Sequence, residues 1–495
     1  MFRKLDLSKE DKGNLITLLV FGLILRTYAF SQIYMISLDG AFQYIPVAKL
    51  FYQGEYLQAL LQPQFPLYPF LISILTHITG DFELSGQVIS IIFSLLTVIP
   101  LYLIGKSLFG PRAGFWTTVL YLINPLMLHS SVDVLKEGLL IFLFFTSVYC
   151  SLSFLQKGKR TWLIWTVIFA AVGALVRINA LVVLAVMGAW LGYRILRGRL
   201  REKNLTYRYL WVLVPILGGI LAFVIAVIWG WEFLTTKKVY GLIHNFRIQW
   251  FGYQRPNVFR IGADIFYIIV RFAEKTYVLP FLLALFGLGW RMKAREFGVE
   301  ERYLALLIVV FIAILFPNLY ASGRYHLPAI FLLYLWAGFG FVKIRELIDS
   351  KFTRYPKLTA VIPVMILLGT ILPISLQPQR LDKIGRKEAG LWLRQQTPTP
   401  PLILTDDPRV AYYAGGAYVT IPPGVTPEKI VNMGIKQRVD YLVIEGKGTE
   451  VSDTFAPFEK KGDLELVLRH PYGHKGRVIY VYKMRRQINP SQKAS

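Results

Sequence analysis

The chain has 495 residues, of which 55% are hydrophobic and 17% are charged, and its formal net charge is +25. Soluble domains carry about 25% charged residues, so this composition argues against a water-soluble enzyme and excludes a disordered chain. The single cysteine, Cys150, excludes an internal disulfide and a cysteine-based zinc site. The excess of basic residues fits either a nucleic-acid partner or the cytosolic loops of a membrane protein. The positions of these residues along the chain distinguish the two interpretations.

Long apolar runs dominate the first three quarters of the chain. A spanning helix needs about 20 mostly apolar residues, because lipid cannot satisfy backbone hydrogen bonds. The run 66–79 is apolar but short and contains two prolines, so we expect a juxtamembrane or re-entrant helix there. About eleven segments are predicted to span the membrane as helices: 15–36, 85–105, 113–130, 138–155, 161–176, 180–194, 209–231, 276–290, 303–320, 327–342 and 358–376.

The basic residues indicate the orientation. With a cytosolic N-terminus, the six cytosolic segments and the bordering Arg194 hold 24 Lys and Arg residues, whereas the outer loops before residue 377, apart from 232–275, hold four. This asymmetry follows the positive-inside rule, and counting 66–79 as a span would reverse it. We therefore expect a multi-pass protein of the cytoplasmic (inner) membrane and no nucleic-acid partner. The cytosolic segments are 1–14, 106–112, 156–160, 195–208, 291–302 and 343–357.

The composition changes after residue 376. Short β-rich runs (402–405, 441–445, 464–469 and 477–484) alternate with the helical patterns 383–396 and 426–437. This order predicts a small α/β domain over 377–495, which the span count places outside the cytosol. Residues 1–376 form the predicted transmembrane domain, with outer loops at 37–84 and 232–275.

Sequence motifs and the positions of the acidic residues limit the reactions that the chain could catalyse. The sequence has no Walker loop, GxGxxG, HExxH, CxxC or GxSxG context, so ATP hydrolysis, nicotinamide chemistry and common metalloprotease chemistry lack support. No acid falls in the middle of a predicted span, which argues against an ion-coupled transporter. Nine acids lie instead on the outer loops before residue 377: Asp39, Glu55, Asp81, Glu83, Asp133, Glu137, Glu232, Asp264 and Glu274.

Asp39 follows the outer end of the first predicted span. A carboxylate at the membrane surface, beside a pocket that excludes water, can act as general base toward a hydroxyl. Residues 39–53 can also form an amphipathic helix lying on the membrane, and Asp39 can simply cap it. From this residue alone both interpretations stay open, and the cap is the commoner use of Asp.

Asp133 and Glu137 lie four residues apart at the predicted outer start of the fourth span. This spacing predicts that they share one helix face, where two carboxylates repel unless a cation, a proton or an arginine lies between them. They are therefore candidates to organise a metal or the substrate phosphate. The alternative is that both acids only complement the dipole of the helix.

Three arginines stand where charge is unexpected. Arg26 lies midway along the first predicted span, where a partner or a wet cavity is needed. Arg177 and Arg324 lie at outer turns, against the positive-inside trend, and a guanidinium suits phosphate well. Snorkelling at the lipid interface is the alternative for each of them. The outer loop 232–275 adds basic and aromatic residues that suit either sugar and phosphate binding or an interfacial belt.

Taken in order, these segments resemble the GT-C superfamily of membrane glycosyltransferases, in the branch of the protein O-mannosyltransferases and lipid A aminoarabinose transferases. The resemblance covers residue 15 to about residue 345 as a pattern and the C-terminal domain more loosely. The oligosaccharyltransferase branch fits less well, because its Trp-Trp-Asp motif is absent from 377–495. The segments that carry the resemblance are LILRTYAF, LDGAFQYIPVAKLFYQGEY, PLYPFLISI, YLIGKSLFGPRAGFWTTVLYLINPLMLHSSVDVLKEGLLIFLFF, ASGRYHLPAIFLLYLW, AGLWLRQQTP, AYYAGG and DYLVIE.

The resemblance implies transfer of a sugar from a polyprenyl-phosphate donor to an acceptor hydroxyl of a protein, lipid or glycan on the outer face. Asp39 matches the first-loop acid of the family, taken as general base, and Asp133 and Glu137 match its second acidic region. Arg324 and Tyr325 match the turn that would hold the donor phosphate. We expect direct displacement with inversion, in which Arg177 or Arg26 assists Arg324.

Two departures from the family pattern leave the acceptor class and the metal requirement open. Gly40 stands where many relatives have a second acid, and Gln64-Phe65-Pro66-Leu67 replaces the commoner His-Pro-Pro-Leu. No cofactor is firmly expected, and Asp39, Asp133 and Glu137 are the candidate ligands for a divalent metal.

Two other functions compete with this interpretation. A flippase or transporter of a lipid-linked glycan would move its substrate without making a bond. An enzyme resembling the O-antigen ligases would use diphosphate-linked donors and would depend on loop arginines such as Arg247 and Arg255 rather than on Asp39.

Overall fold

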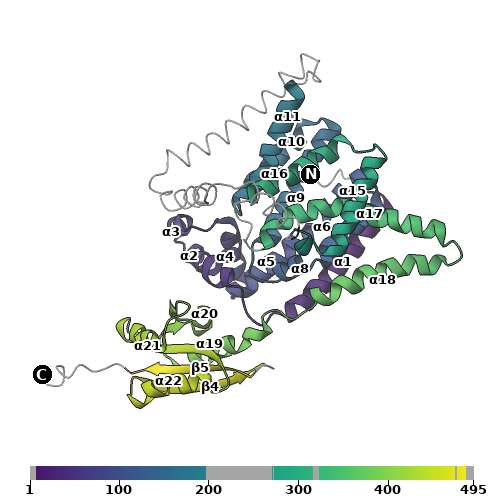
Figure 1. Ribbon diagram of the computed structural model, residues 1–495. Helices are drawn as coiled ribbons and strands as arrows, with labels where there is room; N and C mark the ends of the chain where they lie inside the picture. Colours follow the sequence, from purple (N-terminus) through teal and green to yellow (C-terminus); the bar gives the residue numbers. More distant parts are fainter. Residues whose placement is uncertain (1–6, 197–269, 271, 316–322, 474–475, 486–495) are drawn as a thin grey trace, which may run out of the picture. The chain divides into compact units, whose positions relative to one another are not determined.

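The computed structural model describes residues 7–196, 270, 272–315, 323–473 and 476–485. The chain forms two compact units. The first comprises residues 1–31 and 44–377, and the second comprises residues 32–43 and 378–495. The first unit is helical and the second contains a β-sheet (Figure 1).

The first half of the helical unit contains long apolar helices with two breaks. α1 (Lys9–Ser31) is followed, after the outer segment, by α5 (Phe82–Leu96) and α6 (Val98–Phe109), which meet at Thr97. α7 (Pro111–Ile123) and α8 (Pro125–Ser131) meet at Asn124, whose side chain accepts the Met127 N–H and caps α8. Pro125 cannot donate to the preceding turn, so the predicted span 113–130 is divided there. α9 (Glu137–Lys157) is continuous and almost wholly buried.

The second half contains α10 (Arg160–Ala174), the short 3₁₀ turn η3 (Ile178–Leu181) and α11 (Val182–Leu196). α15 (Val278–Lys293), α16 (Val299–Leu315), the 3₁₀ turn η5 (Gly323–His326), α17 (Leu327–Lys351) and α18 (Pro356–Ser375) follow. α15 and α17 pack closely through glycines. A Cβ on Gly287 would lie 2.2 Å from the Trp336 oxygen, and one on Gly340 would lie 2.2 Å from the Leu283 oxygen. Small residues allow such close packing of helices in a membrane.

The protein is a polytopic helical membrane protein with a C-terminal mixed α/β domain. Within the described residues, five helical segments are long and apolar enough to span a membrane, and three shorter apolar helices accompany them. The count of eleven spans remains a prediction, and the predicted span 209–231 lies outside the described residues. The five long segments are Lys9–Ser31, Phe82–Phe109, Glu137–Lys157, Gly323–Lys351 and Pro356–Ser375.

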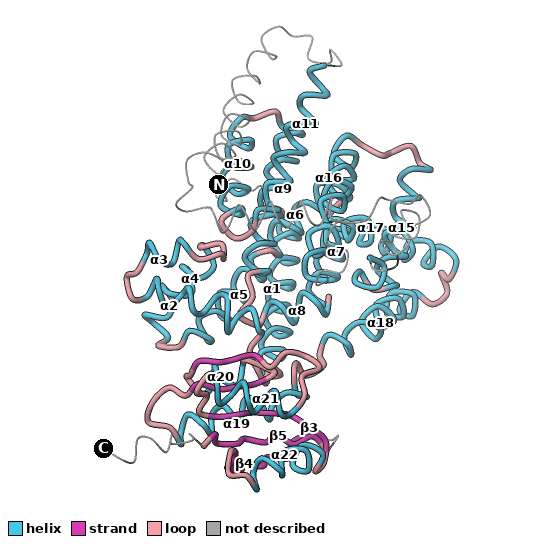
Figure 2. Tube along the Cα trace, turned by 60° about the vertical axis from the view of Figure 1, so that its left-hand side comes forward, coloured by secondary structure: helices cyan, strands magenta, loops and turns pink. Residues whose placement is uncertain are grey.

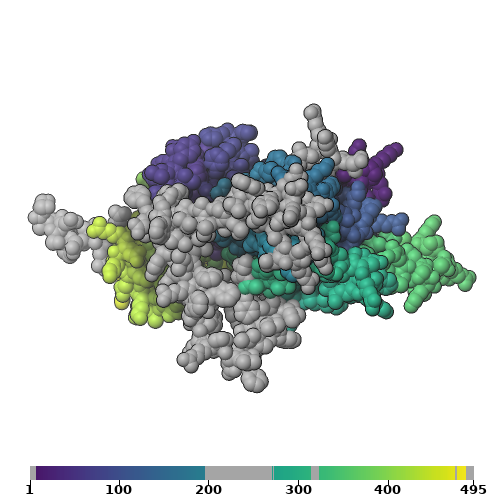
Figure 3. Space-filling view, turned by 90° about the horizontal axis from the view of Figure 1, so that it is seen from above, coloured from purple at the N-terminus to yellow at the C-terminus, as the bar shows by residue number. Residues whose placement is uncertain are grey.

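The outer segment between α1 and α5 folds into short helices. A π-helical turn, η2 (Gly40–Tyr44), leads into α2 (Ile45–Tyr52), followed by α3 (Tyr56–Leu61) and α4 (Leu67–Thr79). Phe51 of α2 packs edge-on against Phe70 of α4, with ring centroids 5.5 Å apart. The single helix predicted over 39–53 is thus observed as two elements, the π-helical turn η2 and the helix α2. Residues of α2–α4 form an indigo lobe in the space-filling view (Figure 3).

The second unit is built on a five-stranded sheet in the order β2-β1-β3-β5-β4. Its strands are drawn in magenta in Figure 2, where β3, β5 and β4 are labelled. β1 (Leu402–Thr405) is parallel to β2 (Ala417–Thr420) and to β3 (Tyr441–Lys447). β5 (Arg477–Met484) is antiparallel to β3 and to β4 (Leu464–Tyr472). β2 is missed in the sequence because it is an exposed edge strand without alternating burial.

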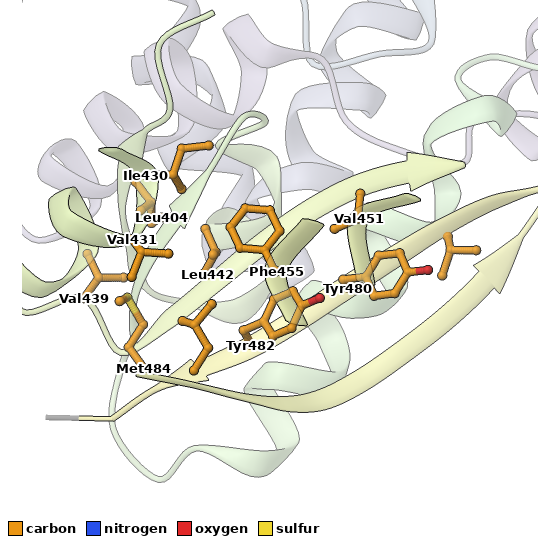
Figure 4. Close-up of a cluster of buried hydrophobic side chains, with 12 residues drawn as sticks. Leu404, Ile430, Val431, Val439, Leu442, Val451, Phe455, Tyr480, Tyr482 and Met484 are labelled. Atoms are coloured by element: carbon orange, nitrogen blue, oxygen red, sulfur yellow. The ribbon is translucent and has the colours of Figure 1, made fainter. Parts of the chain in front are cut away.

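Helices cover both faces of this sheet. α19 (Ile384–Gln396) and α20 (Arg409–Ala414) pack on one face, over a core that includes Ile403 and Val443. α21 (Pro427–Lys436) and α22 (Glu450–Lys460) pack on the other face, over a core with Leu404, Phe455 and Tyr482 (Figure 4). Successive strand residues point to opposite faces, so β1 contributes to both cores.

The segment 32–43 belongs to the second unit and is held there by backbone contacts. The Gln379 N–H donates to the Gln32 oxygen at 2.9 Å, and the Tyr34 N–H donates to the Gln379 oxygen at 3.3 Å. The Ile36 N–H donates to the Tyr413 hydroxyl at 2.9 Å. α1 therefore ends at Ser31, and the last five residues of the predicted span 15–36 do not continue the helix.

Candidate active site

The turn between α8 and α9 carries the second pair of predicted acids. Asp133 is fully buried, and its Oδ1 accepts the Val134 N–H at 2.7 Å. α9 begins only at Glu137, so the expectation that Asp133 and Glu137 share one helix face is wrong. An Asp side chain that bonds to a nearby backbone N–H offers the chain an alternative to the helix, which explains the turn. Glu137 itself occupies the first turn of α9, where a carboxylate complements the helix dipole.

Hydrogen bonds from two other helices hold this turn in place. The Ser90 hydroxyl of α5 donates to the Leu135 oxygen at 2.8 Å, and the Tyr68 hydroxyl of α4 lies 2.8 Å from the same Ser90 oxygen. Gly138 allows α9 to approach α5, because a Cβ at this position would lie 2.6 Å from the Ser90 carbonyl oxygen. The position of Glu137 therefore depends on buried polar contacts with α4 and α5.

Arg324 faces Glu137 from η5. Its Nη1 lies 3.7 Å from Glu137 Oε1, which makes an ion pair without a hydrogen bond. The Glu137 side chain is only 6% exposed, and its Oε2 has no hydrogen-bond partner among the described residues. A buried carboxylate that is incompletely paired is costly, so further donors or a ligand are expected near it.

Arg177 and Tyr325 are stacked. The Arg177 Cζ lies 3.6 Å from the centroid of the Tyr325 ring, and Arg177 is 7% exposed. Burial lowers the pKa of Arg177, and the nearby charge of Glu137 opposes this effect. The turn that carries Arg177 is joined to α4, because the Leu67 N–H donates to the Leu175 oxygen at 3.2 Å.

Lys136 directly precedes Glu137 in the chain, and the sequence reasoning did not assign it to the site. Its Nζ lies 5.7 Å from the ring centroid of Tyr44 and 5.6 Å from that of Phe65. The signal for Lys136 in the sequence is its position, since it is one of the few basic residues on an outer loop. We call Lys136, Glu137, Arg177, Arg324 and Tyr325 the arginine cluster.

Arg26 has a separate environment. It is fully buried in α1, its Nε donates to Ser94 Oγ at 2.7 Å, and its Cζ lies 5.8 Å from the ring centroid of Tyr121. None of these partners contacts Arg177 or Arg324 through the interactions described above. The sequence predicts a partner for the charge of Arg26 in the first span. Among the contacts described, this partner is the hydroxyl of Ser94 together with the ring of Tyr121, and it includes no acid.

Asp39 lies in the second unit, directly before η2. Ser37 caps the start of this segment, because its Oγ accepts the Gly40 N–H at 3.1 Å and its carbonyl accepts the Ala41 N–H at 3.0 Å. Asp39 is partly exposed, and its Oδ1 accepts a hydrogen bond from Gln43 Nε2 at 3.1 Å. Ser37 therefore performs the capping role that was the alternative explanation of Asp39.

The remaining sequence candidates fall outside this geometry. Arg247 and Arg255 lie outside the described residues, as does most of the loop 232–275. Within the ranges that the structure describes, no three His, Cys, Asp or Glu side chains lie close enough to hold a metal ion. Asp39, Asp133 and Glu137 remain metal candidates from the sequence alone.

Residues 62–231 match the protein family described as dolichyl-phosphate-mannose-protein mannosyltransferase. This part of the chain is therefore similar to a family of membrane glycosyltransferases. The matched residues include the acidic turn and Arg177. No curated protein matches the sequence.

Solved structures share the fold of this chain. ArnT from Cupriavidus metallidurans, bound to undecaprenyl phosphate, matches with a TM-score of 0.60 and 15% identity, over 95% of this chain and 98% of ArnT. The Archaeoglobus fulgidus oligosaccharyltransferase in complex with Zn and sulfate matches with a TM-score of 0.58 and 13% identity, over 94% and 72% of the two chains. AglB from the same organism, in complex with an inhibitory peptide and a dolichol-phosphate, matches with a TM-score of 0.56 and 13% identity, over 98% and 75%.

Proposed function

We propose that this enzyme transfers a sugar from a polyprenyl-phosphate donor to an acceptor hydroxyl at the outer face of the membrane. The observation that carries the proposal is the arginine cluster, in which Arg324 pairs with the buried carboxylate of Glu137 and Arg177 stacks on Tyr325. Its net positive charge suits a phosphate, and planar guanidinium groups can bind phosphate oxygens in pairs. The ArnT structure with undecaprenyl phosphate supports a lipid phosphate as the donor carrier.

The reaction is a single displacement. The acceptor oxygen bonds to the anomeric carbon while the bond from that carbon to the phosphate oxygen breaks, and the acceptor proton passes to the Asp39 carboxylate. The leaving polyprenyl phosphate keeps the electron pair and gains one negative charge. Arg324 and Arg177 stabilise this added charge, an interaction that is stronger in the transition state than in the ground state. One attack on one carbon inverts its configuration.

The membrane orientation is part of the proposal. The positive-inside bias supports a cytosolic N-terminus, an extracytoplasmic C-terminal domain, and outer turns that carry Arg177 and Arg324. A donor flipped to the outer leaflet and an acceptor protein, lipid or glycan outside the cytosol are then the partners.

The decisive experiment compares Asp39→Asn with wild type in a transfer assay. Purified protein in detergent receives a radiolabelled polyprenyl-phosphate sugar and membrane-derived acceptors, and the formation of a new glycosidic bond is measured. Loss of a general base lowers the rate by about 10²–10⁴-fold. Asp81→Asn is the matched control, because Asp81 is another outer-loop acid whose role is to accept the Leu84 N–H at the start of α5.

The outcomes separate the competing functions. Product from wild type and Asp81→Asn but not from Asp39→Asn supports the proposal, and an inverted anomeric centre in that product supports single displacement. Absence of product from wild type, together with movement of the labelled lipid across vesicles, would favour a flippase. Full activity of Asp39→Asn would reject Asp39 as the base.

A further inference from the structure

In the C-terminal sheet, the helices that follow the neighbouring parallel strands β1 and β3 pack on opposite faces. β1 is followed by α20, whose Val410 and Ala411 pack on one face of the sheet. The neighbouring parallel strand β3 is followed by α22, whose Val451 and Phe455 pack on the other face (Figure 4). In α/β sheets, the point where neighbouring connections diverge in this way leaves a crevice at the carboxyl ends of the strands, and ligands bind there.

A cavity of about 390 Å³ lies at this position. Asp406 directly follows β1, and Glu445 and Gly446 lie in the last part of β3. Gly446 brings β3 close to α22, because a Cβ there would lie 2.1 Å from Val451 Cγ2. The volume is within the range of small-molecule sites. The cavity is lined by Arg386, Asp406, Glu445, Gly446, Lys447, Glu450 and Arg477.

Ion pairs hold one wall of the cavity rigid. Arg386 Nε donates to Glu445 at 2.7 Å and its Nη2 donates to Asp406 at 2.8 Å, while its Nη1 bonds to Asp407. Arg477 Nη1 donates to the second oxygen of Glu445 at 2.9 Å. Because both arginines already pair with carboxylates of this chain, neither is left with unbalanced charge for an anion.

The charges of the lining balance. Three cations (Arg386, Lys447, Arg477) face three carboxylates (Asp406, Glu445, Glu450). A phosphate would meet three carboxylates and a metal ion would meet three cations, and like charges at short range are unfavourable for either. A neutral ligand with many hydroxyl groups meets no such repulsion, because each hydroxyl can donate to a carboxylate and accept from a lysine or arginine.

Asp406 and the loop after β3 leave polar groups available to such a ligand. The Asp406 side chain is 47% exposed although it pairs with Arg386. Lys447 and Glu450 are exposed, and they lie on either side of Gly448, whose positive φ of 54° turns the chain between β3 and α22.

We propose that this cavity in the C-terminal domain binds a neutral saccharide. Carboxylates of Asp406 and Glu450 accept hydrogen bonds from the sugar hydroxyls, and Lys447 and Arg477 donate to the hydroxyl oxygens. The proposal goes beyond the transfer reaction and does not depend on it, because neither Asp39 nor any residue of the arginine cluster lines this cavity.

The test uses the full-length protein in a detergent without a sugar headgroup. Saturation-transfer NMR and titration calorimetry measure binding of D-mannose, D-glucose, D-galactose and N-acetyl-D-glucosamine. We expect saturable binding of at least one sugar. The double variant Lys447→Met, Glu450→Gln should weaken it at least tenfold, which corresponds to about 1.4 kcal/mol. Neither residue belongs to the Arg386 ion pairs, so this variant should fold, and hydrogen exchange of the sheet checks that it does.

Glu465→Gln is the control, because Glu465 is an exposed carboxylate on β4 that pairs only weakly with Arg485 at 3.5 Å. It should bind the sugar as wild type does. Absence of saturable binding by any of the four sugars would overturn the proposal, as would unchanged binding in the double variant or displacement of the sugar by inorganic phosphate. Asp39→Asn should bind the sugar normally, so failure of the proposed transfer mechanism is distinguishable from failure of this site.

Discussion

Arg177 lies flat against the ring of Tyr325, with its Cζ 3.6 Å from the ring centroid. The two residues come from different turns, one after α10 and one in η5. Stacking uses the face of a guanidinium and leaves the N–H groups at its edge able to donate to phosphate oxygens. A desolvated cation on an aromatic face gains about 2 kcal/mol, which offsets part of the cost of burying Arg177. Tyr325 thus orients Arg177 for donor binding.

Arg177→Lys should raise the KM for the polyprenyl-phosphate donor about tenfold. Lysine keeps the charge but loses the planar stack and the paired donors. Initial rates over a range of donor concentrations measure the change. Tyr325→Ala should act similarly, whereas Tyr325→Phe keeps the ring and should stay within about twofold of wild type. If Tyr325→Phe were as defective as Tyr325→Ala, the hydroxyl rather than the stack would be the important group.

Glu137 and Arg324 should show strong coupling in stability. Arg324→Gln leaves a buried carboxylate with less compensation, and removal of one partner of a buried pair costs about 3–5 kcal/mol. The Arg324 side chain is 22% exposed and the pair is 3.7 Å apart, so we expect the lower end of that range. Thermal unfolding of the single variants and of the double variant Glu137→Gln, Arg324→Gln forms the cycle. Additive losses in the double variant would show that the two charges do not interact.

The sequence predicted the helices of the membrane unit well where one apolar run corresponds to one helix. The span predicted at 138–155 is α9 (Glu137–Lys157), and that at 358–376 is α18 (Pro356–Ser375). The break at Asn124 carried a recognisable signal, since an Asn-Pro pair favours a turn. The fourth span was placed correctly, but its first turn was not, because the side chain of Asp133 competes with the helix for backbone hydrogen bonds.

The arrangement of the candidate site could be predicted only in part from the sequence. Arg177 and Arg324 were identified because a basic residue on an outer turn departs from the charge pattern. Arg177 and Arg324 contact Tyr325 and Glu137 through elements that lie far apart in the chain. The periodicity of a single sequence predicts local helices and strands, but it does not predict such long-range contacts. The association of residues 32–43 with the C-terminal domain was missed for the same reason, since it rests on backbone hydrogen bonds that carry no side-chain signal.

Gly138→Ala should impair both stability and donor binding. A Cβ at this position would lie 2.6 Å from the Ser90 carbonyl oxygen, so α9 must move away from α5. Overpacking of this kind costs about 1–3 kcal/mol. The shift also displaces Glu137, so the KM for the donor should rise together with a fall in melting temperature. Gly188→Ala in α11 is the control, because a Cβ there has nothing within 4 Å. A normal KM in Gly138→Ala would mean that the cluster does not depend on this packing.

Asp407 makes the C-terminal domain sensitive to acid. It follows β1, its side chain is 5% exposed, and it accepts hydrogen bonds from both Arg409 and Arg386. Burial alone raises its pKa, but the hydrogen bonds and charges of Arg409 and Arg386 outweigh this and lower the pKa to about 2. Asp406 beside it behaves in the opposite way, since burial raises its pKa.

The stability that Asp407 contributes should therefore be complete above about pH 5 and should be lost as the pH falls from about 5 to about 2. The folded pKa lies below the unfolded value of 3.8, so the unfolded state binds the proton first and acid favours unfolding. A difference of nearly two pKa units corresponds to about 2 kcal/mol. Hydrogen exchange of β1 and β3 amides in the full-length protein, corrected for the intrinsic pH dependence of exchange, measures this loss. Asp407→Asn should flatten the pH dependence, whereas Asp406→Asn should leave the fall between about pH 5 and about pH 2 in place. An equal slope in Asp407→Asn and wild type would assign the acid sensitivity to other carboxylates.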